Sequence, residues 1–167
     1  MAISQATQII IGYLAGAGDH RGIQKRVWST TAVSTVVSLS VTALLFTFAR
    51  PIFGLFTADA AVVELGRQIL LIEFVLEIGR SVNIVMVRCL VAVGDVNFPV
   101  GLGVVSMWGV SVLGSWFFGV HLGMGLTGVW WAMAADECLR AVIFLFRFAS
   151  GVWKKKLAGI SSREKTA

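Results

Sequence analysis

The chain has 167 residues, of which 57% are hydrophobic and only 14% are charged. A soluble domain has about a quarter of its residues charged, so this composition excludes an ordinary soluble domain and favours a membrane protein. The formal charge is +5, but the basic residues are not interleaved with aromatic side chains on one face, so nucleic acid is not an expected partner.

Five apolar runs, the first one short, predict an all-α transmembrane helix bundle. The first run covers about 2–15 and leads into a polar turn, "GAGDHRGIQKR". The second covers about 27–49 and is rich in Ser, Thr and Val, which suits close contacts between helices in lipid. Arg50 and Pro51 are expected to end it.

The third run follows a short interfacial connection, "IFGLFTAD", and covers about 64–91. Such a helix is about 40 Å long, so its ends are expected to lie among the lipid headgroups. The fourth and fifth runs cover about 100–120 and 128–148, and the turns "GDVNFP" and "HLGMGLT" precede them. We therefore expect a helix bundle over 1–150 and a basic tail over 151–167.

Basic residues in the connections predict the orientation of the bundle, because Lys and Arg gather on the cytoplasmic side. Arg21, Lys25 and Arg26 follow the first run, whereas only Arg50 follows the second and none follows the fourth. This pattern predicts a multi-pass protein of the plasma membrane with a cytoplasmic tail. "GAGD" and "VGD" then both fall at cytoplasmic turns, which suggests an internal repeat, and Trp153 beside the lysines is expected to anchor in the interface.

The third run carries a stripe of charges. Glu73, Glu77, Arg80 and Arg88 fall within about an 80° arc of a helix, with Asn83 on its flank. A charge at the centre of a spanning helix costs about 2.5 to 3.5 kcal/mol, so it must pair or face water. Glu77 lies near the middle of the run, and Glu73 is expected to have less local compensation.

The fifth run repeats this order of charges. Asp136 and Glu137 lie near its middle, Arg140 follows one turn later, and Arg147 shares a face with Asp136. In one interpretation the acid and arginine pairs are structural clasps that join helices. In the other, one or more acids bind a proton, a metal cation or an organic cation in a water-filled cavity.

Other motifs are few. No cluster with the spacing of metal ligands, no phosphate loop and no paired nucleophile and base is found, so no metal site, cofactor or enzymatic activity is expected. Gln5, Gln8 and Tyr13 are candidates to line a cavity. Four tryptophans are candidates either to stack on a flat cationic ligand or to anchor at the interface: Trp108, Trp116, Trp130 and Trp131.

Four stretches taken together carry a family resemblance. "GYLAGAGD", "EIGRSVN", "VRCLVAVGDVNFP" and "GMGLTGVWWAMAADECLRA" resemble the C-terminal part of the multidrug and toxic compound extrusion (MATE) family, along essentially all of the chain. The resemblance implies twelve helices in two lobes, of which these five runs correspond to about the eighth to the twelfth. The N-lobe and the seventh helix of the same transporter would then be missing partners. Met1 would be an internal or mis-assigned start, or the chain would be the product of a broken gene.

The same resemblance implies a function. The intact protein would export organic cations or amphipathic drugs by antiport with H⁺ or Na⁺, and Glu73 or Glu77 would match the acidic position of the family's tenth helix. The expected polar interior comprises Glu77, Arg80, Asn83, Asp136, Glu137 and Arg140. Two alternatives stay open: an exporter of lipid-linked saccharides, and a non-transporting membrane subunit or inert truncated fragment.

Overall fold

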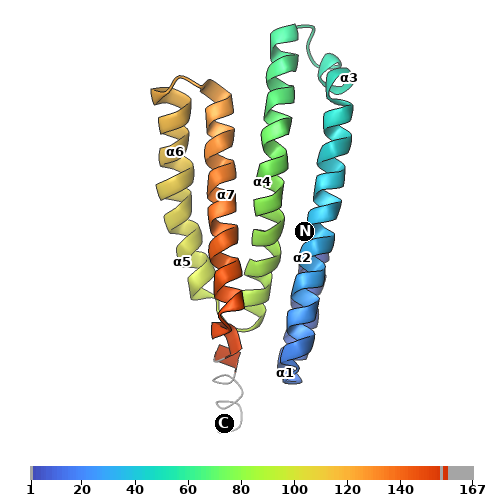
Figure 1. Cartoon of the computed structure of the whole chain (residues 1–167), viewed down its shortest axis with the longest axis vertical. Helices are drawn as coiled ribbons and strands as arrows, with labels where there is room; N and C mark the ends of the chain where they lie inside the picture. Colours follow the sequence, from blue (N-terminus) through green and yellow to red (C-terminus); the bar gives the residue numbers. More distant parts are fainter. Residues whose placement is uncertain (1, 155, 158–167) are drawn as a thin grey trace.

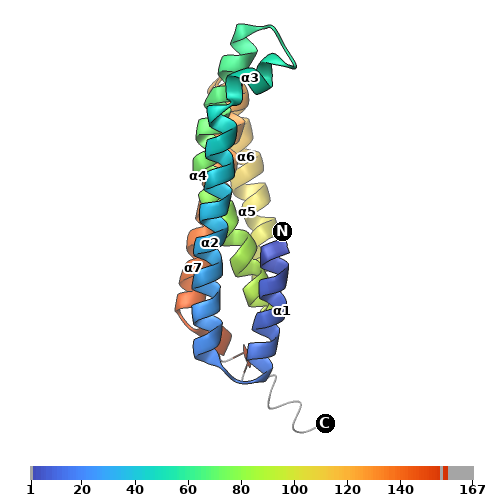
Figure 2. The ribbon, with the colours of Figure 1, turned by 90° about the vertical axis from the view of Figure 1, so that its right-hand side faces the viewer.

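The computed structural model describes residues 2–154, 156 and 157, and within these the chain is helical with no strand. Long helices run side by side in a narrow, elongated bundle (Figures 1 and 2), which confirms the expected all-α fold. In chain order the elements are α1 (Ala2–Gly16), α2 (His20–Thr47), α3 (Ala49–Gly54), α4 (Ala60–Ala92), α5 (Asn97–Ser106), η1 (Met107–Val112), α6 (Leu113–Ser115), η2 (Trp116–His121) and α7 (Gly125–Ala149).

The turn between α1 and α2 and the turn between α4 and α5 share one backbone geometry. Gly18 and Gly94 have φ of 71° and 82°, in the left-handed region that glycine adopts readily. The amide of Asp19 donates to the carbonyl oxygen five residues earlier at 3.0 Å, and the amide of Asp95 does the same at 2.8 Å. The two similar sequence stretches therefore form the same turn, and both turns lie at one end of the bundle (Figure 1).

The structure corrects both ends expected for the second apolar run. The helix begins at His20 rather than 27, because the carboxylate of Asp19 accepts the Gly22 amide at 2.8 Å and caps it. It ends at Thr47, earlier than expected, since the ring of Pro51 would clash with the carbonyl of Thr47 in a continuous helix. The chain continues as the short α3, which forms the first part of the connection expected there.

The longest helix, α4, has 33 residues and is about 50 Å long. It begins at Ala60, after Asp59, and α7 packs along it. Two helices among the described residues are long and apolar enough to cross a bilayer by length and composition alone: His20–Thr47 and the continuous helix Asn97–His121. α4 has 33 residues and α7 has 25, but both carry charged residues near their middle.

The fourth apolar run forms one continuous helix from α5 to η2, with two π-helical segments, η1 and η2. Its glycines allow a close approach to α7. A Cβ added at Gly114 would lie 3.1 Å from the Cβ of Ala132, and one added at Gly119 would lie 3.0 Å from a methyl carbon of Val129. Small residues at helix contacts serve this purpose in membranes, where no hydrophobic effect drives helices together.

The main hydrophobic core joins α1, α2, α4 and α7 at the end of the bundle that holds the two glycine turns. Trp153 belongs to this core and has no exposed surface. Its ring stacks on Phe148 with centroids 5.4 Å apart, and its Nε1 donates to the Phe148 carbonyl oxygen at 3.1 Å. The expectation of an interfacial anchor is therefore wrong, because this indole finds its partners inside the protein. The expected basic tail lies mostly outside the described residues.

Candidate functional site

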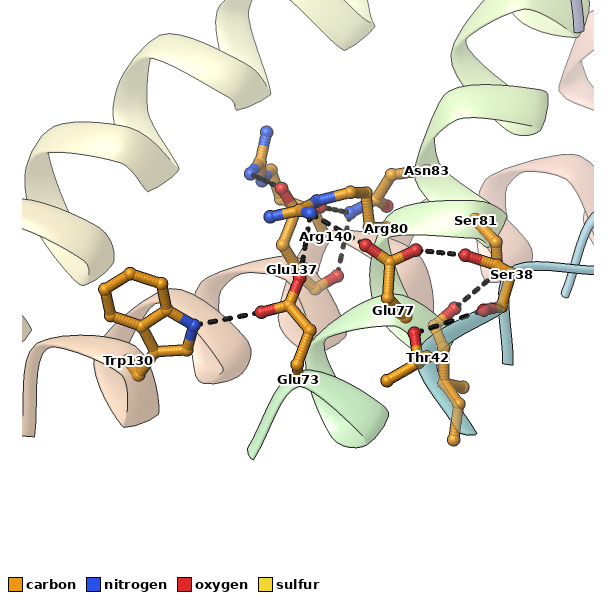
Figure 3. Close-up of polar contacts among 11 residues, drawn as sticks. Ser38, Thr42, Glu73, Glu77, Arg80, Ser81, Asn83, Trp130, Glu137 and Arg140 are labelled. Carbon is orange, nitrogen blue, oxygen red and sulfur yellow. Dashed lines mark hydrogen bonds and ion pairs between the residues drawn. The ribbon is translucent and has the colours of Figure 1, made fainter. Parts of the chain in front are cut away.

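The charges expected from the sequence meet along the contact between α4 and α7 (Figure 3). They lie near the middle of two helices that run in the same direction, side by side (Figure 1). Both predicted groups of charges therefore belong to one continuous polar region. We call this region the charged seam, and it consists of Glu73, Glu77, Arg80 and Asn83 of α4 and Asp136, Glu137 and Arg140 of α7.

The α4 half of the seam is organised by Arg80. Its Nη1 lies 2.7 Å from Oε1 of Glu77, one turn away, and 3.2 Å from Oε1 of Glu73, two turns away. One guanidinium nitrogen thus bridges two carboxylates. These three residues, here named the Arg80 cluster, carry a formal charge of −1 when both acids are ionised.

The α7 half repeats this arrangement around Arg140. Its Nη2 lies 2.7 Å from Oδ2 of Asp136 and 3.0 Å from Oε1 of Glu137. The side chain of Asp136 is 4% exposed, which makes it the most buried carboxylate of the seam, and it also accepts a hydrogen bond from the Ser106 hydroxyl of α5. These three charged residues, the Arg140 cluster, also have a formal charge of −1 when ionised.

Neutral donors, rather than ion pairs, connect the seam across helices. The Ser38 hydroxyl of α2 donates to Glu77, and Nε1 of Trp130 in α7 donates to Oε2 of Glu73 at 2.9 Å (Figure 3). Asn83 donates from Nδ2 to the backbone oxygen of Glu137 at 2.8 Å and also to its carboxylate.

Two expectations change as a result. The pairs of Glu77 with Arg80 and of Glu137 with Arg140 lie within single helices, so they do not themselves clasp one helix to another. Glu73 is not the less compensated acid either. Like Glu77, it has one guanidinium partner and one neutral donor.

A glycine allows this close meeting of α4 and α7. A Cβ added at Gly79 would lie 2.7 Å from the carbonyl carbon of Glu137 and 2.8 Å from the amide nitrogen of Cys138. Only hydrogen fits between these two backbones. Gly79 thus brings the Arg80 cluster within reach of the Arg140 cluster, and a larger residue there would separate them.

Three hollows border the seam. One, of about 410 Å³, lies between the α5–η1 helix and α7 and is lined by all three residues of the Arg140 cluster. A second, of about 420 Å³, lies between α4 and α7 and contains Arg80, Asn83 and Arg140. A third, of about 230 Å³, has Glu77 on its wall beside α1 and α2. The two larger volumes fall in the range of small-molecule sites.

Sequence reasoning missed the hydroxyl partners of the seam, Ser38 and Ser106. The Ser and Thr content of the second run predicted polar helix contacts in general, but no pattern singled out Ser38. The residues of the first run that were candidates to line a cavity differ in their surroundings. Gln8 accepts a hydrogen bond from Arg88 at 3.3 Å, whereas the Tyr13 side chain points outward and the residue is 79% exposed.

Arg147 lies outside the seam, in a second ionic group at the glycine-turn end of the bundle. Its Nε lies 2.8 Å from Oδ2 of Asp95, and Nζ of Lys156 lies 2.5 Å from the other carboxylate oxygen. Burial by itself raises the pKa of Asp95, but the hydrogen bonds and charges of its two basic partners outweigh burial and hold this pKa below the usual value. The group ties the residues after α7 to the α4–α5 turn.

Known proteins have sequences similar to this one. The MatE family model matches residues 1–117. An uncharacterized transporter of Bacillus subtilis, YisQ, is 33% identical over 155 residues, which cover 93% of this chain and 34% of that protein. The probable multidrug resistance protein NorM of Burkholderia pseudomallei is 29% identical over 154 residues, and that of Thermotoga maritima is 25% identical over 158 residues.

These matches cover 89% and 92% of this chain for the two NorM proteins, but 33% of each relative. The chain therefore spans about a third of the length of the curated relatives that it matches. No solved structure matches it. The family model covers more than half of the chain, and the relatives extend the similarity through α7. This chain belongs to the MatE family of multi-pass membrane transporters.

Proposed function

We propose that this chain forms most of the C-terminal lobe of an exporter of organic cations or amphipathic drugs, driven by antiport with H⁺ or Na⁺. Two of the relatives cited above are named as probable multidrug resistance proteins, and the third as a transporter. The observation that carries the proposal is the charge balance of the seam. Each of its two clusters has two carboxylates and one guanidinium group.

This balance favours the uptake of a cation. With both acids ionised, each cluster keeps one negative charge that its own arginine does not neutralise. Such a charge is expensive at mid-bilayer, where the dielectric constant is low. One proton or one monovalent cation would neutralise a cluster, whereas an organic cation would do so while its apolar part occupies a neighbouring hollow. The same acids can therefore serve ion and substrate in alternation.

The test is efflux of an organic-cation dye from vesicles that contain the whole protein to which this chain belongs, driven by a proton or sodium gradient. Glu77→Gln removes the charge and keeps the shape, so it is expected to lower ion-driven efflux by at least about tenfold, the equivalent of one lost charge-assisted hydrogen bond. Membrane insertion should be unchanged, because the substitution makes the helix less polar.

Glu64→Gln is the matched control. Glu64 lies in the same helix and pairs with Arg67 at 3.3 Å, but its side chain is 56% exposed and outside the seam. This variant should transport like the parent. Undiminished efflux in the Glu77→Gln variant would contradict the assignment, whichever gradient drives it.

A second candidate function is a non-transporting membrane subunit in which the seam is only structural. It is favoured by the fact that each carboxylate of the seam already has a guanidinium partner at 3.2 Å or less. In that case neither gradient would drive dye efflux in the parent protein. Exchanging Glu77 with Arg80 should then preserve assembly, since the pair would keep its opposite charges.

The proposed orientation places the glycine-turn end in the cytoplasm at the plasma membrane. Arg21, Lys25 and Arg26 lie at this end, and so does the end of α7 (Figure 1). Enrichment of basic residues on one side supports a cytoplasmic location for that side. Labelling of an introduced cysteine at position 21 from outside whole cells would contradict this orientation.

A further inference from the structure

Arg88 of α4 differs from the other arginines in the long helices α4 and α7. Arg67, Arg80, Arg140 and Arg147 each have a carboxylate within 3.3 Å. Arg88 is half-buried, yet among residues 2–154, 156 and 157 it makes no ion pair. Its Nη1 donates to the neutral Oε1 of Gln8 at 3.3 Å.

Arg88 is surrounded by arginines whose charges are already balanced by their own acids. It lines the hollow of about 420 Å³ between α4 and α7 together with Arg80 and Arg140, and the one carboxylate on that wall is Glu137. Glu137 is already held by Arg140 and Asn83. Along α4 the nearest acid, Glu77, is eleven residues away, or about 16 Å, and Asp95, just beyond α4, is already paired with Arg147 and Lys156. No described carboxylate therefore neutralises Arg88.

The position of Arg88 suits the boundary of the bilayer. It lies four residues before Ala92, the last residue of α4, which corresponds to about 6 Å along the helix. An arginine side chain can extend over this distance toward the headgroup layer. The hollow is also amphipathic, because Ile84, Val87 and Val91 line it beside the guanidinium groups.

We propose that Arg88 and this hollow form a binding site for a phosphate group, supplied by an anionic phospholipid headgroup or by a free phosphate anion. The guanidinium of Arg88 would hold two phosphate oxygens through its forked N–H groups. Arg80 and Arg140 are balanced by their own acids, so Arg88 would supply the charge of the site, and the apolar side chains would pack against the start of an acyl chain. The hollow borders the seam at Glu137, but Arg88 itself lies outside the seam, and the site does not depend on transport.

The first test needs no substitution. The whole protein to which this chain belongs is purified and placed in phosphatidylcholine bilayers with or without phosphatidylglycerol, or with inorganic phosphate, at one ionic strength. Phenylglyoxal then modifies accessible guanidinium groups, and peptide mass spectrometry gives the rate at each arginine. Arg26, exposed in α2 at the same end of the bundle and without a described ion pair, is the internal control.

Selective slowing at Arg88 by phosphatidylglycerol would support a lipid headgroup as the source, and selective slowing by inorganic phosphate would support a free anion. Equal rates at Arg88 in all three conditions would overturn the proposal. Equal slowing at Arg88 and Arg26 would also overturn it, because this pattern reflects the surface potential of the membrane and not a site.

A second test uses substitution and native mass spectrometry of retained lipid. Arg88→Gln is expected to weaken retention of phosphatidylglycerol, or binding of inorganic phosphate, about tenfold, because a charge-assisted hydrogen bond is lost. Arg88→Lys keeps the charge but not the fork, so a smaller loss is expected. Arg26→Gln should retain the ligand like the parent. Parent-level retention in the Arg88→Gln variant would overturn the site.

Discussion

The contact of Gly79 with the backbone of α7 provides the sharpest test of the seam. We predict that Gly79→Ala separates these helices, although alanine favours helix formation over glycine by about 1 kcal/mol. The new Cβ would lie 2.7 Å from the carbonyl carbon of Glu137 and 2.8 Å from the amide nitrogen of Cys138. Both are backbone atoms, so no side-chain rotation can relieve the clash.

The magnitude follows from these distances. Non-bonded carbon atoms prefer a separation of about 3.5 to 4.0 Å, so the two helices must move apart locally by on the order of 1 Å. Overpacking of this kind costs about 1–3 kcal/mol, which exceeds the gain in helix propensity. The same movement would stretch the 2.8 Å bond from Asn83 to the Glu137 carbonyl beyond the usual limit of about 3.2 Å.

Gly101→Ala is the matched control, because a Cβ at this glycine of α5 meets nothing within 4 Å. Thermal unfolding in one detergent should show the Gly79→Ala variant less stable than the parent, and the Gly101→Ala variant equal or slightly more stable. We therefore predict that the two substitutions change the stability in opposite directions, or that only Gly79→Ala changes it. A Gly79→Ala variant at least as stable as the parent would refute the reasoning from backbone contact.

Two further variants test single bonds. Trp130→Phe removes the 2.9 Å hydrogen bond to Glu73 and should lower the free energy of unfolding by about 0.5–1.5 kcal/mol. Trp131 is exposed and has no described hydrogen bond, so Trp131→Phe should leave thermal unfolding unchanged. Equal effects of the two substitutions would contradict a role for the indole N–H of Trp130. Asp95→Asn should speed tryptic cleavage after Lys156, and unchanged cleavage would show that the ionic group does not hold the chain there. Because the pKa of Asp95 is below its usual value of about 3.9, its carboxylate stabilises the fold above that pH. Protection of the amides near Lys156, measured relative to their intrinsic exchange rates, should therefore fall as pH falls through the lowered pKa.

Helix content and the position of the charges could be predicted from sequence, because both depend on local periodicity. Apolar runs long enough for a bilayer gave the long helices, and the stripe from Glu73 to Arg88 followed from the angle between successive helical residues. The turns at Gly18 and Gly94 were also recognisable, since glycine before aspartate recurs in both. Errors of boundary arose at caps, as with Asp19, whose side-chain bond starts α2 early.

Partners across helices depend on the tertiary structure. Periodicity places Arg80 beside Glu77 and Arg140 beside Glu137, but it does not say that Ser38 reaches Glu77 or that Asn83 bridges α4 to α7. Those contacts depend on which faces meet and at what depth, and both are set by steric fit at positions such as Gly79. The sequence alone therefore determined that this protein carries charges within long apolar helices. The packing decided that they form one seam, that Trp153 is buried, and that Arg88 has no described acid beside it.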